Sequence, residues 1–359
     1  MALRIVATVI SGALWFYSVL LFAGSFGSGL HFIGIFLVAP VGLFFAIAVH
    51  ELGHAAAAHA VGWRVIVVVI GPLGFQLPNR DFAWVPRAKR HYASGWVLAA
   101  PPTLKLATNP RDIGYTAGGP IASLGYAMSM FIGAWLVPDL GEFSTVSTPI
   151  LCGAFGVQSL AMFFGTIIPH VRGPTTSDGY KILAALKQRP IDVKGRSLSW
   201  LAAMLQASVR LRNLPEWMVQ QVIVSSQRDE GIARFIDSVV VGRALDVDSP
   251  DIPAARRLLN DFRARYGVSH WLVACEAFLA AAHEHDPGRA KAALAELEPP
   301  SEIPQLTLAA EAAIAMLEGQ RDMAKRKCSE MIKIVRQEKD FPDVTYRDLE
   351  RKVFALAAR

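Results

Sequence analysis

A short segment near residue 50 carries side chains that can bind a metal ion and move a proton. It reads His50-Glu51-Leu52-Gly53-His54 and lies within a long apolar stretch. On a helix, residues four apart share a face, so the two imidazoles can bind one Zn²⁺. Zinc makes hydroxide available from a bound water near neutral pH, and the carboxylate between the imidazoles can take the proton. The segment predicts a hydrolytic zinc site with two histidine ligands and Glu51 as general base.

The apolar surroundings of this motif favour a functional interpretation. An ionised carboxylate in a membrane helix costs several kcal/mol unless it has a partner, so such groups are rarely without a role. The alternative is a polar cluster that joins helices through hydrogen bonds. We favour the metal site, and the alternative stays open on the sequence alone.

A catalytic zinc site needs a third protein ligand, for which Asp178 is the best candidate. A third histidine six residues after His54 is excluded, because Ala60 stands there. Asp178 follows the last apolar run, and the glycines and proline around it interrupt helical structure. Such a break lets the backbone face a polar cavity at membrane depth. The alternative role for this residue is a helix N-cap.

Four apolar runs predict four transmembrane helices. They cover residues 5–23, 32–60, 113–137 and 149–169, and each is long enough to supply the roughly 20 residues that cross a bilayer. The 359-residue chain is 53% hydrophobic and 18% charged, whereas soluble proteins carry about 25% charged residues. The first run could be a signal peptide, but its length favours an uncleaved helix.

The distribution of basic residues predicts the orientation in the membrane. Seven lysines and arginines lie in the connection 62–112, and more follow residue 170, whereas the other two connections have none. Basic loops stay in the cytoplasm, so both termini are predicted to be cytoplasmic, in a bacterial cytoplasmic membrane. This brings the histidine pair and Asp178 to a similar depth. It also accounts for the net charge of +6, and no recognition motif suggests a nucleic acid partner.

The connection 62–112 also carries a signal for β-structure. Residues 65–70 are a β-branched run ended by Gly71-Pro72, which predicts a strand, and residues 74–78 could turn it into a hairpin. The stretch 84–96 alternates aromatic and basic residues. It is either an anchor in the lipid headgroups or a plain basic loop.

The chain changes character near residue 190 and becomes an ordinary soluble, helical sequence. Ala255, Ala290 and Ala324 lie 35 and 34 residues apart, each opening an alanine-rich helix. This is the period of tetratricopeptide repeats, although an alanine-rich helical sequence can produce it by chance. We therefore predict three regions: a first helix and loop (1–30), a membrane-embedded core (31–187) and a cytosolic helical domain (188–359). The last either binds a protein or peptide or serves as a structural cap.

Two further segments extend the likeness of the His-Glu-x-x-His helix to a known family. Gly119-Pro120 with Ser123 is similar to Gly-Pro-x-x-Asn, and Thr166 with Pro169, followed by Asp178-Gly179, is similar to Asn-x-x-Pro followed by Asp-Gly. Together the motifs resemble the site-2 protease family of intramembrane zinc metallopeptidases over residues 32–187. The resemblance implies a Zn²⁺ cofactor and a transmembrane protein substrate that is cut within the bilayer.

The resemblance also implies substrate contacts. Ser123 and Thr166 stand where the family has asparagines that help to hold the substrate backbone or the oxyanion, and a hydroxyl offers one donor where an amide offers two. A helical substrate must unwind before attack, because its peptide bonds are engaged in its own hydrogen bonds. The strand at Ile66 and Val68, if unpaired at one edge, could hold the unwound segment by strand addition. His170 is a further candidate for a substrate or metal contact, with anchoring at the membrane interface as the alternative.

A non-catalytic membrane scaffold is the alternative function. In it, the cytosolic helical domain would bind proteins and the metal site would be structural or decayed. A transporter finds no support, because no inverted repeat is evident in the sequence.

Overall fold

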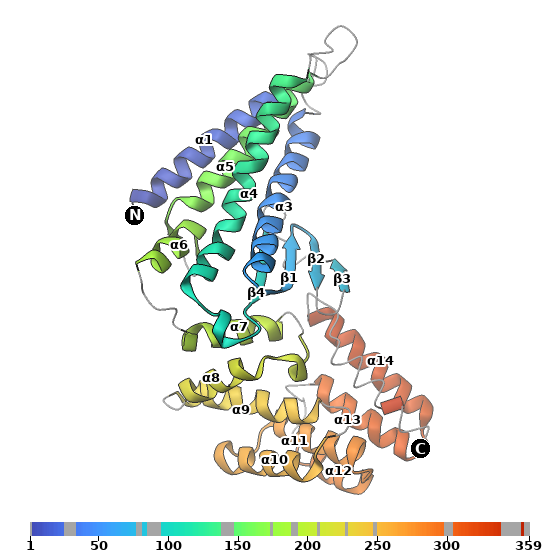
Figure 1. The fold of residues 1–359 in the computed structure, drawn as a ribbon. Helices are drawn as coiled ribbons and strands as arrows, with labels where there is room; N and C mark the ends of the chain where they lie inside the picture. Colours follow the sequence, from blue (N-terminus) through green and yellow to red (C-terminus); the bar gives the residue numbers. More distant parts are fainter. Residues whose placement is uncertain are drawn as a thin grey trace. The chain divides into compact units, whose positions relative to one another are not determined.

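The computed structural model describes residues 2–24, 34–76, 81–84, 95–137, 147–172, 175–187, 193–206, 209–226, 229–246, 250–297, 304–338 and 353–354. They form two compact units, Met1–Asp192 and Val193–Arg359 (Figure 1). The first unit combines long apolar helices with a four-stranded sheet and a two-stranded sheet, β5 (Val171–Arg172) and β6 (Thr175–Thr176). The described elements of the second unit are all helical.

Four long helices of the first unit are apolar enough to cross a membrane. They are α1 (Ala2–Gly24), α3 (Ala39–Ala60), α4 (Asn109–Leu136) and α5 (Thr148–Ile167). A π-helical turn, Gly34–Val38, precedes α3 and extends its apolar span. Large apolar side chains such as Phe16 and Trp135 lie exposed on these helices, as expected of surfaces that face lipid. The prediction of four membrane helices is confirmed in length and composition.

The helices pack side by side, with α4 against both α3 and α5 and α1 against α5 (Figure 1). Glycine makes the α3–α4 contact possible. A Cβ atom built on Gly118 would lie 2.4 Å from the Gly53 carbonyl oxygen, and one built on Gly53 would lie 2.5 Å from the Gly118 carbonyl oxygen. Only glycine at both positions lets the two backbones approach this closely. The short distance between α3 and α4 brings α4 side chains and carbonyls within reach of the histidines on α3.

A small antiparallel sheet follows α3. Its strand order is β3-β2-β1-β4, with β1 (Arg64–Ile70), β2 (Leu73–Gln76), β3 (Asp81–Trp84) and β4 (Gly95–Ala100). The predicted strand 65–70 is confirmed, and it forms a hairpin as expected. The turn lies at Gly71-Pro72, however, and residues 74–76, which were expected to turn, belong to β2; β3 and β4 were not predicted. Residues 85–94, most of the aromatic and basic stretch, lie outside the described residues.

The sheet contradicts the prediction that the strand at Ile66 and Val68 has a free edge for the substrate. β1 is a central strand, in which Val68 pairs with Phe75 of β2 on one side and with Val97 of β4 on the other. Ile66 lies at a shift in the β1–β4 register, and its side chain is buried, as is that of Val68. Val68 packs on Ile47 of α3. The expectation of a free edge at Ile66 and Val68 is therefore wrong, because neighbouring strands and α3 occupy the surfaces that it required.

The second unit consists of paired helices, which confirms the predicted helical character of this region. Its helices are α7 (Val193–Gln206), α8 (Glu216–Ser226), α9 (Glu230–Leu245), α10 (Ile252–Tyr266), α11 (His270–Phe278), α12 (Pro287–Leu294), α13 (Pro304–Leu317) and α14 (Arg321–Glu338). A 3₁₀ turn, Leu211–Asn213, precedes α8, and a π-helical turn, Leu279–His283, extends α11.

The period of 34–35 residues has a physical basis in this unit. Ala255, Ala290 and Ala324 are all buried near the starts of α10, α12 and α14. The side chains of Asp251 and Asp286, 35 residues apart, cap α10 and α12. Small buried residues at a fixed place in successive helices let neighbouring helices pack closely. The assignment to tetratricopeptide repeats stays a prediction.

Candidate metal centre

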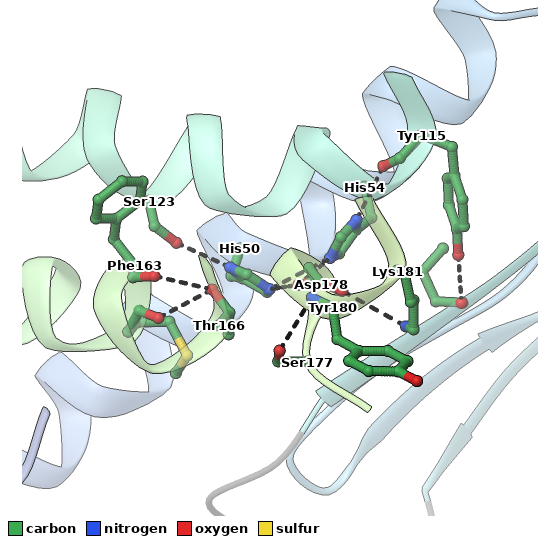
Figure 2. Close-up of polar contacts among 12 residues, drawn as sticks. His50, His54, Tyr115, Ser123, Phe163, Thr166, Ser177, Asp178, Tyr180 and Lys181 are labelled. Atoms are coloured by element: carbon green, nitrogen blue, oxygen red, sulfur yellow. Dashed lines mark hydrogen bonds and ion pairs between the residues drawn. The ribbon is translucent and has the colours of Figure 1, made fainter. Parts of the chain in front are cut away.

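His50 and His54 of α3 and Asp178 of α6 (Asp178–Leu186) converge on one point in the first unit (Figure 2). His50 Nε2 lies 3.3 Å from Asp178 Oδ2, and His54 Nε2 lies 3.4 Å from the same oxygen. The two Nε2 atoms are 3.2 Å apart. All three side chains are buried. They form a group that could hold a metal ion, in the region of the membrane helices.

Asp178 reaches α3 because the chain turns back after α5, so that the start of α6 packs against the end of α5. A Cβ atom built on Gly179 would lie 1.7 Å from the Ile167 carbonyl oxygen, so only glycine lets α6 begin against the end of α5. Ser177 provides the N-cap of α6, and its hydroxyl accepts from the Tyr180 N–H. The alternative role of Asp178 as the N-cap is therefore wrong. Its carboxylate is left to face the imidazoles.

Hydrogen bonds on the far side of each ring orient the two imidazoles toward Asp178. His54 Nδ1 lies 3.0 Å from the Tyr115 carbonyl oxygen. Because a carbonyl only accepts, the nitrogen carries the hydrogen, and the neutral ring presents the Nε2 lone pair inward. His50 Nδ1 lies 2.9 Å from the Ser123 hydroxyl oxygen, which places its Nε2 in the same position toward Asp178. Both rings are thus oriented by α4.

When His50, like His54, carries its hydrogen on Nδ1, the three converging atoms are all acceptors. Two Nε2 lone pairs and a carboxylate oxygen within 3.4 Å of one another repel each other unless a cation lies between them. Lys181 Nζ is 3.5 Å from Asp178 Oδ1, the other carboxylate oxygen, and does not lie between the ligands. The donor set of two imidazoles and one carboxylate suits a divalent transition metal.

A cavity of about 320 Å³ opens beside this group. The side chain of Glu51 lines it together with the two histidines and Asp178. Gly95, the first residue of β4, also lines it, and a Cβ atom built there would lie 2.5 Å from Glu51 Cγ. The sheet therefore has a residue without a side chain at the point where the Glu51 carboxylate lies. Gly95 was not predicted as a site residue, because a glycine at the start of a strand was the only signal for it.

Gly119 has a comparable role on α4. A Cβ atom built on it would lie 2.3 Å from His54 Nε2. The two successive glycines of the Gly-Gly-Pro segment thus have separate tasks. Gly118 admits the backbone of α3, and Gly119 keeps the space in front of the His54 nitrogen open.

The two hydroxyl residues among the predicted substrate contacts, Ser123 and Thr166, have different surroundings. Ser123 is not among the described residues that line the cavity; it lies behind His50. Thr166 lines the cavity, but its hydroxyl lies within hydrogen-bonding distance of the Met162 and Phe163 carbonyl oxygens of its own helix (Figure 2). An intrahelical bond of this kind leaves only the oxygen lone pairs of Thr166 for a substrate.

Histidines outside the predicted ligand set are also placed by the structure. His170 lines the cavity, and its Nδ1 donates to the Ile168 carbonyl oxygen over 2.9 Å. His59 lies exposed in the last turn of α3 and does not belong to the metal group. His170 therefore remains a candidate for a substrate contact.

No protein-family model, no curated protein and no solved structure matches this chain. The class of protein is therefore defined by its fold and site. Among the described residues, four helices are long and apolar enough to cross a membrane, and a buried His-His-Asp group lies beside three of them, α3, α4 and α5, in a cavity that Glu51 also lines.

Proposed function

We propose that this protein is an intramembrane zinc metallopeptidase of the site-2 protease type, which hydrolyses a peptide bond in a membrane-spanning substrate. One observation carries the proposal: His50, His54 and Asp178 converge beside Glu51 in a cavity among the membrane helices. The spacing of ligand and base residues on α3 is that of zinc peptidases.

The separations between the ligand atoms favour zinc. Ligands that surround a tetrahedral zinc at about 2.0–2.1 Å are roughly 3.3–3.4 Å from one another. The three separations here are 3.2, 3.3 and 3.4 Å. Three protein ligands leave the fourth position open, as in catalytic sites. Zinc, when bound, would lower the pKa of a coordinated water and polarise the substrate carbonyl.

The residues of this chain supply the remaining chemistry. Glu51 lies next to the ligands on the same helix and lines the same cavity, so its carboxylate can take a proton from a water there. It can then give that proton to the leaving amine. Lys181, whose Nζ is 3.5 Å from Asp178 Oδ1, holds the second oxygen of the proposed carboxylate ligand.

The structure favours β4 as the strand that receives an unwound substrate. Gly95 and Trp96 line the cavity close to Glu51 and belong to the strand at the end of the sheet order. Farther along β4, the Tyr115 hydroxyl donates to the Val97 carbonyl oxygen over 2.7 Å. A substrate segment would therefore lie along the first residues of β4 only, in place of the contacts expected at Ile66 and Val68.

We extend the proposal to the rest of the chain. The basic connections favour both termini in the cytoplasm of a bacterial cell, with the lipid bilayer around the four apolar helices α1, α3, α4 and α5. The helical region 188–359 would be a cytosolic domain that binds a protein or peptide, since stacked helix pairs form binding surfaces.

The test is cleavage by purified protein in lipid vesicles that also contain candidate single-pass membrane proteins. Glu51→Gln should bind zinc like the wild type and cleave nothing, because the amide cannot accept the proton. A non-catalytic scaffold makes the opposite prediction: no zinc-dependent cleavage by the wild type, and Glu51→Gln equal to it in every binding assay.

A further inference from the structure

We propose that Ser123 is a positioning residue that orients His50 for metal binding, and that it does not contact the substrate. The inference rests on the proposed function, since it assumes that the His-His-Asp group binds zinc. It reassigns a residue whose counterpart in the resembling family is an asparagine at the substrate.

The geometry places Ser123 on the wrong side of His50 for a substrate contact. Its Oγ lies 2.9 Å from His50 Nδ1, whereas Asp178 lies beyond the opposite nitrogen of the same ring (Figure 2). Ser123 is 0% exposed. A peptide in the cavity would therefore meet the imidazole before it could meet the hydroxyl.

The hydrogen bond supports the tautomer that metal binding requires. A hydroxyl can donate or accept, and a metal at Nε2 leaves the ring hydrogen on Nδ1, for which Ser123 Oγ is the acceptor. When His50 Nδ1 carries the hydrogen and donates to Ser123 Oγ, the Nε2 lone pair faces Asp178 and His54. The bond also prevents rotation of the ring. His54 Nδ1 donates in the same way to the Tyr115 carbonyl oxygen. That partner belongs to the backbone, so Ser123 is the partner that a substitution can remove.

The packing of the helices explains why a hydroxyl suffices here. Gly53 and Gly118 bring α3 and α4 into backbone contact, so a short side chain on α4 reaches the ring. An asparagine side chain is longer and would need more space at this buried position. The departure from the family pattern thus agrees with the close approach of the two helices.

A third helix fixes Ser123 itself. The Ser159 hydroxyl of α5 donates to the Ser123 carbonyl oxygen over 2.8 Å, and Ser159 is also 0% exposed. The contacts His50–Ser123 and Ser123–Ser159 join α3, α4 and α5 at one level of the bundle. Buried polar contacts of this kind between membrane helices hold their relative positions.

The experiment compares Ser123→Ala with Ser129→Ala in the full-length protein, in the absence of any substrate. Ser129 lies on the same helix, is exposed, and its hydroxyl donates only to the Gly125 carbonyl oxygen. Zinc affinity is measured by competition with a chelator, and the ligand geometry by the visible absorption of the Co²⁺-loaded protein. We expect Ser123→Ala to bind zinc about 10–100-fold more weakly, with an altered Co²⁺ spectrum, as for loss of a metal ligand's hydrogen-bond partner. Ser129→Ala should match the wild type in both.

The possible outcomes separate the inference from the proposed function. A wild-type protein that binds no zinc would contradict the proposed function. A wild type that binds zinc, with Ser123→Ala equal to it in affinity and Co²⁺ spectrum, would overturn the inference alone. In that case, a rise in KM for Ser123→Ala would indicate that Ser123 contacts the substrate. Thermal unfolding of both variants checks that neither effect reflects a general loss of structure.

Discussion

The substitution Gly119→Ala tests the geometry of the proposed metal centre with a single methyl group. The added Cβ would lie 2.3 Å from His54 Nε2, whereas real Cβ atoms essentially never approach other atoms closer than 3.0 Å and ordinary contacts begin at 3.4 Å. The imidazole must therefore move by roughly 1 Å, because the helix backbone that carries the methyl group cannot yield. Metal–ligand distances tolerate only about 0.2 Å. We expect zinc affinity to fall by at least about 100-fold, the upper end of the effect of losing a supporting hydrogen bond.

The assay measures zinc content and chelator competition on purified protein, with Gly125→Ala as the matched control. Gly125 lies on the same helix, and a Cβ atom built on it meets nothing within 4 Å. Both variants gain the same helix propensity, so any general effect of alanine on α4 appears in both. The reasoning is refuted if Gly119→Ala, folded as judged by circular dichroism, keeps the zinc affinity of Gly125→Ala.

Two further substitutions test other parts of the account. Gly95→Ala places a Cβ 2.8 Å from Glu51 Oε1. It should lower the rate of cleavage by about 100-fold, within the range of general-base effects, while zinc content stays at the wild-type level. The control is Gly153→Ala, where a Cβ meets nothing within 4 Å, and equal cleavage by the two variants would contradict the placement of Glu51. Ala290→Leu overfills a position that is 0% exposed and should destabilise the helical unit by about 1–3 kcal/mol. Hydrogen exchange of α12 in the full chain measures this loss. The exposed Ala292 on the same helix, changed to leucine, should leave exchange unchanged, and equal exchange in both variants would argue against close packing at the repeated alanine.

Local sequence patterns were sufficient for the features that depend on one segment. Long apolar runs predicted the four membrane helices, and the spacing of His50 and His54 on one helix predicted their shared direction. Asp178 was identified from its position after the last run and the glycines around it. The β-branched run 65–70 predicted β1, because the signals for a strand and for the turn that ends it lie within a few residues of each other.

Features that depend on distances between segments could not be predicted. The central position of β1 follows from its pairing with β4, which lies some 30 residues later in the chain, and no local pattern indicated that pairing. The role of Gly95 requires knowledge of which strand end meets Glu51. Ser123 was expected at the substrate because its motif suggested it. Its position behind His50 follows from the backbone contact between Gly53 and Gly118, which only the folded bundle reveals.

Metal analysis of the purified protein, wild type against Asp178→Ala, tests the central claim most directly. The account predicts about one zinc per wild-type chain, with an X-ray absorption spectrum of nitrogen and oxygen ligands near 2.0–2.1 Å and no sulfur. In Asp178→Ala, which leaves His50 and His54 in place, the zinc should be largely lost. A wild type without zinc, or an Asp178→Ala protein that holds as much zinc as the wild type with an unchanged spectrum, would contradict it.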